Sequence, residues 1–156
     1  MSCAVYKKPT MSTMKRLLGE DVRALEVAYE RDPHVLDGTE TYHVVHTAVM
    51  NDNREMVRAL FRLDPACLHR TNGDGWSALH FAAYNNRVEL IRMICAEMDG
   101  SGVDALTARS RTPMHLAAMS AHFEAVAMLR RMGSKADAMR DAGGKTPADY
   151  QQSAFM

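Results

Sequence analysis

The sequence has few of the features that mark membrane and secreted proteins. It contains no apolar run near the length of about 18 residues that a transmembrane helix needs, and no apolar stretch typical of a signal peptide. Its three cysteines, Cys3, Cys67 and Cys95, are odd in number and far apart, which argues against a disulfide framework and fits no metal-ligand spacing. We therefore expect no membrane association and a reducing compartment, the cytoplasm or the nucleus.

The chain also lacks an excess of charge of either sign. Nineteen basic and nineteen acidic residues cancel, so no global field attracts nucleic acid or an anionic membrane. Aromatic residues make up only 6% of the 156 residues, and their positions therefore carry information. This length suits one domain with a sizeable buried core.

What the sequence does contain is a repeat. The segment Thr112–Ala118 reads Thr-Pro-Met-His-Leu-Ala-Ala, in which Thr suits a helix N-cap and Pro suits the first helical position. Related segments begin at His43, Ser77 and Thr146, so that four copies follow one another at intervals of about 34 residues. Such regular spacing predicts a repeat protein.

The repeat resembles the ankyrin family, whose signature is Thr-Pro-Leu-His-x-Ala. An acidic residue followed by two apolar ones starts the second half of three copies, at Glu55, Glu89 and Glu124. Asn72–Gly75 and Asp141–Gly144 occupy the place of the family's Asp-x-x-Gly turn. The resemblance covers about residues 37–156 and implies an all-α solenoid of stacked helix-turn-helix units with short β-hairpin-like turns.

This resemblance organises the chain into segments. Residues 1–12 are predicted to form a flexible tail, and residues 13–36 capping helices. Three units follow and a half unit ends the chain, at about 37–70, 71–106, 107–138 and 139–156. The inner helix of the first unit is expected over Val44–Asn51. In the third unit Ser110 replaces the turn Gly, which predicts a distorted turn.

Structural roles for several residues come with the resemblance. The signature histidines His46, His80 and His115 are implied to hydrogen-bond backbone groups and tie neighbouring units together. Asp149 departs from this pattern, and with Thr146 it resembles a capping box. Seven apolar residues are expected to form the continuous core: Leu60, Leu79, Leu90, Ile94, Leu116, Val126 and Leu129.

Sites for chemistry have weaker support. His43 and His46 have a spacing that can place two metal ligands on one helix face, but no third ligand is spaced near them. Gly143–Thr146 matches only the end of a phosphate-binding loop, because Met139 stands where that loop needs Gly. A Cys–His pair stays open, since such pairs form in space, although Cys95 fits an apolar helix face. We expect no metal, no cofactor and no catalysis.

The family's variable contact positions flank the turns and follow the Ala-Ala pair. Mapped onto this chain, they predict partner-binding residues Tyr42, Met50, Asn51, Asp74, Trp76, Tyr84, Asn85, Arg109, Arg111, Met119 and Lys145, with Thr39, Glu40 and Ser120 beside them. Aromatic residues gather in the first two units and basic residues in the last two. Trp, Tyr and Arg are frequent interface anchors.

The sequence therefore predicts a non-catalytic module that binds a partner protein on the concave face of the stack, as an adaptor, scaffold or inhibitor. A small assembly chaperone that shields one subunit surface is the alternative. Nucleic acid is an unlikely partner, resting on Arg109, Arg111 and Lys145 alone. We expect no small-molecule substrate.

Overall fold

The structure, a computed structural model, describes residues 22–31 and 39–156, with side chains from Val44 onward in the second range. This part of the chain contains eight α-helices and two short 3-10 helices, and no strand. The predicted tail at 1–12 lies outside the described residues. So does most of the predicted capping segment at 13–36, of which only α2 (Val22–Arg31) is described.

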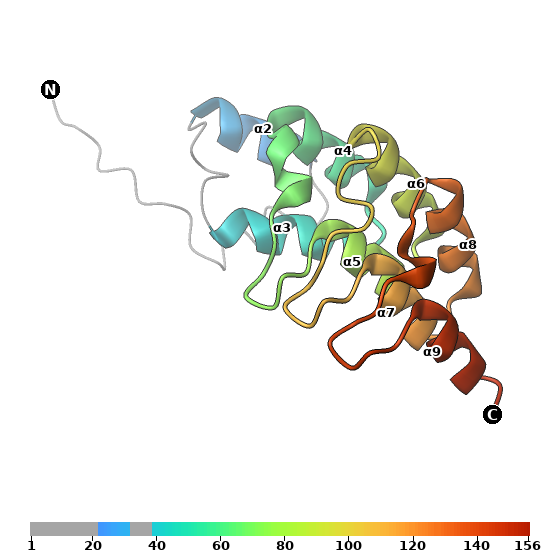
Figure 1. Ribbon diagram of the computed structural model, residues 1–156. Coiled ribbons are helices and arrows are strands. Elements are labelled where there is room, and N and C mark those ends of the chain that lie inside the picture. The colour runs from blue at the N-terminus through green and yellow to red at the C-terminus, as the bar shows by residue number, and fades with distance from the viewer. Residues whose placement is uncertain (1–21, 32–38) are drawn as a thin grey trace, which may run out of the picture.

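The helices form two rows (Figure 1). The inner row consists of α3 (Thr39–Met50), α5 (Ala78–Tyr84), α7 (Pro113–Met119) and α9 (Pro147–Ser153). The outer row consists of α2, α4 (Arg54–Leu63), α6 (Val88–Glu97) and α8 (Phe123–Arg131). Inner helices pack on one another along the row, and α3, α5 and α7 each pack on the outer helix that follows them, which gives the all-helical solenoid that the repeat predicted. The 3-10 helices Pro65–His69 and Ala136–Ala138 lie in the connections between units.

A repeated cap starts the inner helices. The Thr112 Oγ1 accepts a hydrogen bond from the His115 amide at 3.3 Å, and the His115 Nδ1 accepts one from the Thr112 amide at 3.2 Å. Pro113 fills the first helical position, where an amide hydrogen would have no intrahelical partner. In α9, Thr146 and Asp149 exchange the same two bonds, at 2.8 and 3.3 Å, which confirms the predicted capping box.

A tight turn then separates the inner from the outer helix. Asp52, Asn86 and Ala121 take left-handed φ values of 54°, 54° and 58° at equivalent positions. The amide of the following residue bonds back to the inner helix in each case, as in Arg87 N to Ala82 O at 2.8 Å. This closing pattern satisfies the last helical carbonyls and sends the chain back antiparallel.

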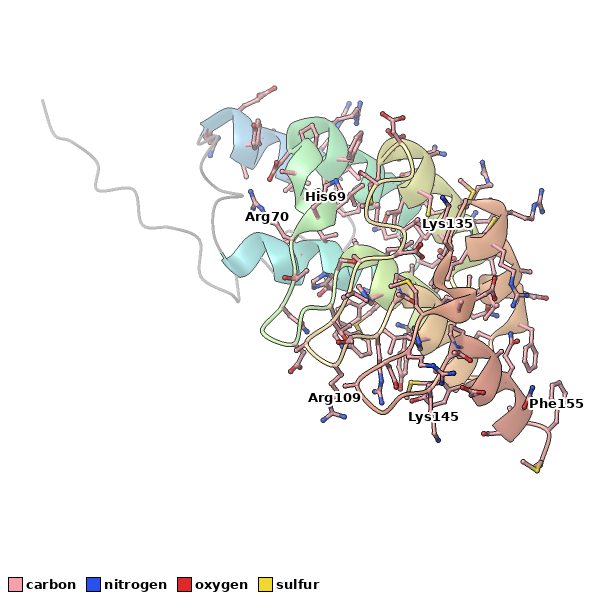
Figure 2. All side chains as sticks on the ribbon, viewed as in Figure 1. His69, Arg70, Arg109, Lys135, Lys145 and Phe155 are labelled. Carbon is pink, nitrogen blue, oxygen red and sulfur yellow. The ribbon has the colours of Figure 1, made fainter. Side chains whose placement is uncertain are left out.

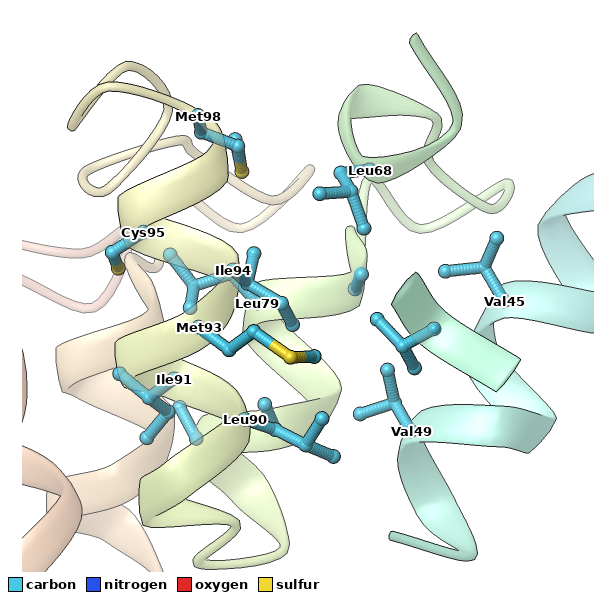
Figure 3. Packing of buried hydrophobic residues seen from close by; sticks show 14 of the residues in the cluster. Val45, Val49, Leu68, Leu79, Leu90, Ile91, Met93, Ile94, Cys95 and Met98 are labelled. Atoms are coloured by element: carbon cyan, nitrogen blue, oxygen red, sulfur yellow. The ribbon is translucent and has the colours of Figure 1, made fainter. Parts of the chain in front are cut away.

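Apolar side chains between the two rows form one continuous core (Figure 3). All seven residues that the sequence assigned to the core are buried. Val45 and Val49 of α3 face Leu79 of α5 and Leu90 of α6, so each unit buries its apolar side against the next. Cys95 is also buried in this cluster, as the sequence predicted. Because one unit cannot enclose these side chains alone, stacking supplies most of the stability.

The first unit differs from its prediction. Its inner helix begins at Thr39 rather than near Val44. The other inner helices follow a turn that contains a residue at positive φ, Gly75, Ser110 or Gly144. The segment Thr39–His43 contains neither Gly nor Pro and continues as helix, which makes the predicted boundary wrong by about one turn.

Candidate functional site

Three hairpin turns precede α5, α7 and α9. In each, the amide of the first residue bonds to the carbonyl of the fifth: Asn72 to Trp76 at 3.1 Å, Thr107 to Arg111 at 2.9 Å and Asp141 to Lys145 at 2.9 Å. The side chain of the first residue also accepts bonds from two amides inside the turn. The side-chain oxygens of Asn72, Thr107 and Asp141 therefore stabilise the three turns in the same way.

The turn that precedes α7 keeps this geometry although Ser110 replaces Gly. Ser110 takes a left-handed φ of 55°, and its amide bonds to Thr107 O at 2.9 Å, as Gly75 and Gly144 bond to Asn72 and Asp141. The expectation of a distorted turn is therefore wrong. The surrounding hydrogen bonds hold a residue with a Cβ in a conformation that costs about 1–2 kcal/mol more than it would for Gly.

Backbone bonds connect successive turns. The Ala108 amide donates to Asp74 O at 2.9 Å, and the Ala142 amide donates to Arg109 O at 3.0 Å. Below them, His80 Nε2 lies 3.2 Å from Arg111 O and His115 Nε2 lies 3.1 Å from Lys145 O. These two histidines therefore tie neighbouring units, as the resemblance implied.

The tautomer of His80 follows from its contacts. Its Nδ1 accepts a hydrogen bond from the Ser77 amide at 3.1 Å, so the neutral ring carries its proton on Nε2 and donates it to Arg111 O. Burial lowers the pKa of His80 from 6.5 to about 4, and backbone hydrogen bonds to Arg111 and Ala105 offset only part of this. His80 is therefore neutral at physiological pH.

His46 is also buried, and its ring lies 4.5 Å from that of Phe81 in the next unit. This tilted ring contact joins the first two units. The backbone tie that the resemblance implied for His46 stays a prediction.

Trp76 is the centre of an aromatic cluster. Its ring lies 5.0 Å from Phe81 and 5.5 Å from Tyr84, which meets it edge-on. These contacts leave Trp76 half-buried, where the sequence led us to expect an accessible side chain. The sequence reasoning did not select Phe81, although this residue directly follows the signature His80.

An exposed apolar row runs along the inner helices. Met50, Tyr84 and Met119 each stand four residues after a signature histidine, and their exposed fractions are 48%, 47% and 40%. We call these three residues the apolar row. The residues after them differ in role: Asn51 is exposed, whereas the Asn85 Nδ2 donates to Phe81 O at 2.8 Å and helps to end α5.

Four of the predicted partner-binding residues line one hollow of about 240 Å³ between the turns that precede α5 and α7. The hollow, called the turn hollow below, is lined by Asp74, Trp76, Thr107, Ala108, Arg109 and Arg111. Tyr84 contacts the ring of Trp76, so the turn hollow adjoins the apolar row. The structure thus brings together residues from two units that sequence reasoning had selected separately.

Arg111 is held in place. Its Nε lies 3.2 Å from Asp141 Oδ2, with the side chains only 23% and 1% exposed. Burial alone would raise the pKa of Asp141. Hydrogen bonds from Tyr150, from the Lys145 and Gly143 amides and from Arg111 outweigh it and lower the pKa from 3.8 to about 2. The sequence selected Arg111 as a contact residue and gave no sign of this ion pair.

Arg109 and Lys145 project from the tips of neighbouring turns (Figure 2). The Lys145 Nζ lies 5.3 Å from the centre of the Tyr150 ring, and the Arg140 Nη1 donates to Gly144 O at 2.6 Å. Arg140 is a third basic residue at these tips, and the sequence reasoning did not select it. The turn edge of the last two units is therefore basic.

Tyr42, Thr39 and Glu40 were predicted at a turn. They lie in α3, and their side chains fall outside the description. The early start of α3 places all three on a helix, so their predicted turn position is wrong. The candidate site is thus built from the second to fourth units, together with Met50 and Asn51 at the end of α3.

The outer row contains a second hollow that the sequence did not reveal. It measures about 520 Å³ and is lined by residues of α2, α4 and α6: Val22, Glu55, Arg58, Phe61, Arg62 and Glu97. Among the side chains that the structure describes, those of residues 22–31 and 44–156, no three of His, Cys, Asp or Glu come together as a possible metal site. Within residues 22–31 and 39–156, no helix is long and apolar enough to cross a membrane.

Comparison with known proteins agrees with this architecture. A family model described as ankyrin repeats in three copies matches residues 1–105, and a model of a single ankyrin repeat matches residues 109–141. A protein of Oryza sativa subsp. japonica, "Probable E3 ubiquitin-protein ligase XBOS31", is 36% identical over 97 residues, which cover 62% of this chain and 21% of that protein.

Two further relatives are the "Notch-regulated ankyrin repeat-containing protein" of Xenopus tropicalis and that of Xenopus laevis. Each is 37% identical over 54 residues, which cover 35% of this chain and 46% of the relative. The chain thus spans less than half of the length of these curated relatives. The repeated caps, the paired helices and the matches over most of the sequence lead to one conclusion: the chain belongs to the ankyrin-repeat family.

Proposed function

We propose that this protein is a non-catalytic binding module that holds a segment of a partner protein against its inner, concave face. Ankyrin repeats generally mediate protein–protein interaction, and this chain has their architecture. The proposed contact surface consists of the apolar row and the turn hollow beside it. An adaptor role is the specific form that we favour, because the outer row has a separate hollow of about 520 Å³.

The apolar row carries the proposal. Three large apolar side chains occupy the same position in three successive units, and each is 40% exposed or more. Scattered exposed apolar residues are ordinary, but a line of them across a stack indicates an interaction surface. Tyr and Met also suit this task, since Tyr is a frequent anchor and Met adapts its shape to a partner.

The test is affinity purification from the native source with wild-type protein and a Tyr84→Ala variant as baits. Tyr84 contacts Trp76 but is half exposed, so its loss should leave folding cooperative. We expect binding of the recovered partner to weaken by about 2 kcal/mol, roughly 30-fold in Kd. A matched control is Arg92→Ala on α6, whose exposed ion pair with Glu89 lies on the outer row.

Equal affinity of the partner for wild type and Tyr84→Ala would refute the proposed surface. The mass of the purified complex then distinguishes the two roles. An adaptor forms a ternary complex with two different partners, whereas an assembly chaperone forms a one-to-one complex that a second protein does not join.

We extend no ligase activity to this chain from its rice relative, which it matches over 21% of that protein's length. Burial raises the pKa of both Cys67 and Cys95 to about 12, which suits packing rather than nucleophilic chemistry at neutral pH. We also propose a location in the cytoplasm or nucleus, where thiols such as those of Cys67 and Cys95 stay reduced. Imaging of the tagged protein in its native cells tests the location.

A further inference from the structure

We propose that the turn hollow receives an acidic side chain of the partner segment, next to a large apolar side chain that rests on Tyr84. This inference rests on the proposed function and specifies the chemistry of the partner: an extended protein segment in which Asp or Glu stands near an apolar anchor. The argument depends on the size of the hollow, its charge and its position beside the apolar row.

The walls of the turn hollow come from two units that are held at a fixed separation. The bond from the Ala108 amide to Asp74 O joins the two turns at 2.9 Å. Gly75 approaches the next turn so closely that a Cβ there would lie 3.0 Å from Ala108 N. The hollow is therefore rigid, and its volume of about 240 Å³ is below that of typical sites for drug-sized ligands. It suits a single side chain.

The charge of the lining favours an anion. Two basic residues, Arg109 and Arg111, and one acidic residue, Asp74, line the hollow. Asp141 holds Arg111 by its Nε, which fixes the direction of the guanidinium plane. Within the part of the chain that the structure describes, no carboxylate forms an ion pair with Arg109. Arg109 therefore offers its charge to a ligand.

The next turn extends the positive potential. The hydrogen bond from the Ala142 amide to Arg109 O joins the turn of Arg109 to the turn that contains Lys145 and Arg140. Asp149 interacts electrostatically with Arg140 and Lys145. The two tips thus have an excess of one positive charge. Their four basic residues are Arg109, Arg111, Arg140 and Lys145, and their three acidic residues are Asp74, Asp141 and Asp149. An approaching carboxylate is attracted, and a basic segment is repelled.

The apolar contact lies beside the anion site. Trp76 forms one wall of the hollow, and its ring centre is 5.5 Å from that of Tyr84. In an extended peptide, side chains on the same face are two residues, or about 6.6 Å, apart. A segment that places an apolar side chain on Tyr84 therefore presents its residue two or four positions away to the hollow. The expected partner motif is therefore a large apolar residue with Asp or Glu two or four positions away.

The experiment is selection from a phage-displayed library of random 12-residue peptides on purified wild type, Arg109→Glu and Lys135→Glu. Lys135 is exposed and lies away from the turn tips (Figure 2), so it supplies the same change of charge at another place. We expect wild type and Lys135→Glu to select Asp or Glu two or four residues from a large apolar residue. Arg109→Glu should select Lys or Arg there instead.

A synthetic peptide of the selected sequence then measures the subsite directly. Replacing its acidic residue by the amide should weaken binding to wild type about 10-fold. The same replacement should strengthen binding to Arg109→Glu, because it removes the repulsion between two carboxylates. Urea unfolding confirms that each variant is folded.

The outcomes separate this inference from the proposed function. Selected peptides that lose binding on Tyr84→Ala but show no acidic preference would overturn the anion site and leave the proposed function standing. Peptides that bind Tyr84→Ala as tightly as wild type would overturn both. Preferential, Arg109-dependent binding of a 20-base-pair DNA duplex, with no acidic peptide selected, would replace the anion site by a nucleic-acid contact.

Discussion

The two halves of the inner face share one backbone and differ in their side chains. The first two units expose Met50 and Tyr84 beside the half-buried Trp76. The third unit exposes Met119, but the turn tips of the last two units hold Arg109 and Lys145. Trp76, Arg111 and Lys145 even close their turns with the same carbonyl bond. The comparison shows that the repeated backbone places side chains at equivalent positions in every unit. Only the residue types at these positions make one end apolar and the other basic.

The two halves should respond to acid in different ranges of pH, and this is the largest effect that we predict. His80 in the apolar half has a pKa near 4 when folded and 6.5 when unfolded. The unfolded chain then binds more protons between these values, so stability is fully present above pH 6.5 and falls as pH drops toward 4. The loss from this one group amounts to about 3 kcal/mol. Urea unfolding at pH 7, 5.5 and 4.2 measures it.

Asp141 in the basic half acts lower on the pH scale. Its folded pKa of about 2 is below the ordinary 3.8, so its contribution is present above pH 3.8 and falls as pH drops toward 2. The Asp141→Asn variant should therefore still lose unfolding free energy between pH 6.5 and 4. It should not show the further loss below pH 3.8. An imidazole of His80 that titrates near 6.5 by NMR would contradict this assignment.

Glycine substitutions sharpen the comparison between turns. Gly75 and Gly144 have nearly equal φ values, 77° and 75°, but an alanine methyl at Gly75 would lie 3.0 Å from Ala108 N, whereas nothing lies within 4 Å at Gly144. Gly144→Ala should lower the free energy of unfolding by about 1 kcal/mol, because alanine is strained at this φ. Gly75→Ala should lower it by about 2–3 kcal/mol, because the next turn must also move. Thermal and urea unfolding give both values, and equal losses would mean that the two turns are not packed as described.

The smallest effect concerns the turn that has no glycine. Ser110 takes a φ of 55° in the same hydrogen-bonded turn, so Ser110→Gly should stabilise the protein by about 0.5–1 kcal/mol. The reverse change, Gly144→Ser, serves as the control and should destabilise by a similar amount. A loss of stability in Ser110→Gly would show that the hydroxyl makes a contribution larger than the backbone strain.

The sequence predicted the repeated parts of the fold well, because each repeat contains its own cap and apolar spacing. The signature residues Thr112, Pro113 and His115 form the predicted cap, and His115 reaches the next unit. Prediction failed at Thr39–His43, where the repeat degenerates and no turn residue stops the helix. At Ser110 the pattern suggested a distortion, yet hydrogen bonds from both sides of the turn impose the common geometry.

The candidate site was predictable in position but not in detail. The family's contact positions after the Ala-Ala pair selected Met50, Tyr84 and Met119, and the structure leaves all three exposed. The ion pair between Arg111 and Asp141 joins residues from different units, and no local pattern reveals which side chains meet across that junction. The outer hollow depends in the same way on α2, α4 and α6 together.

Site-specific photo-crosslinking tests the central claim, that a partner protein binds the inner face. A benzoylphenylalanine is placed at position 84 on the apolar row in one variant and at position 92 on the outer helix α6 in another. With the partner recovered by affinity purification, crosslinks should form from position 84 and not from position 92. Crosslinks from position 92 with none from position 84 would contradict the account.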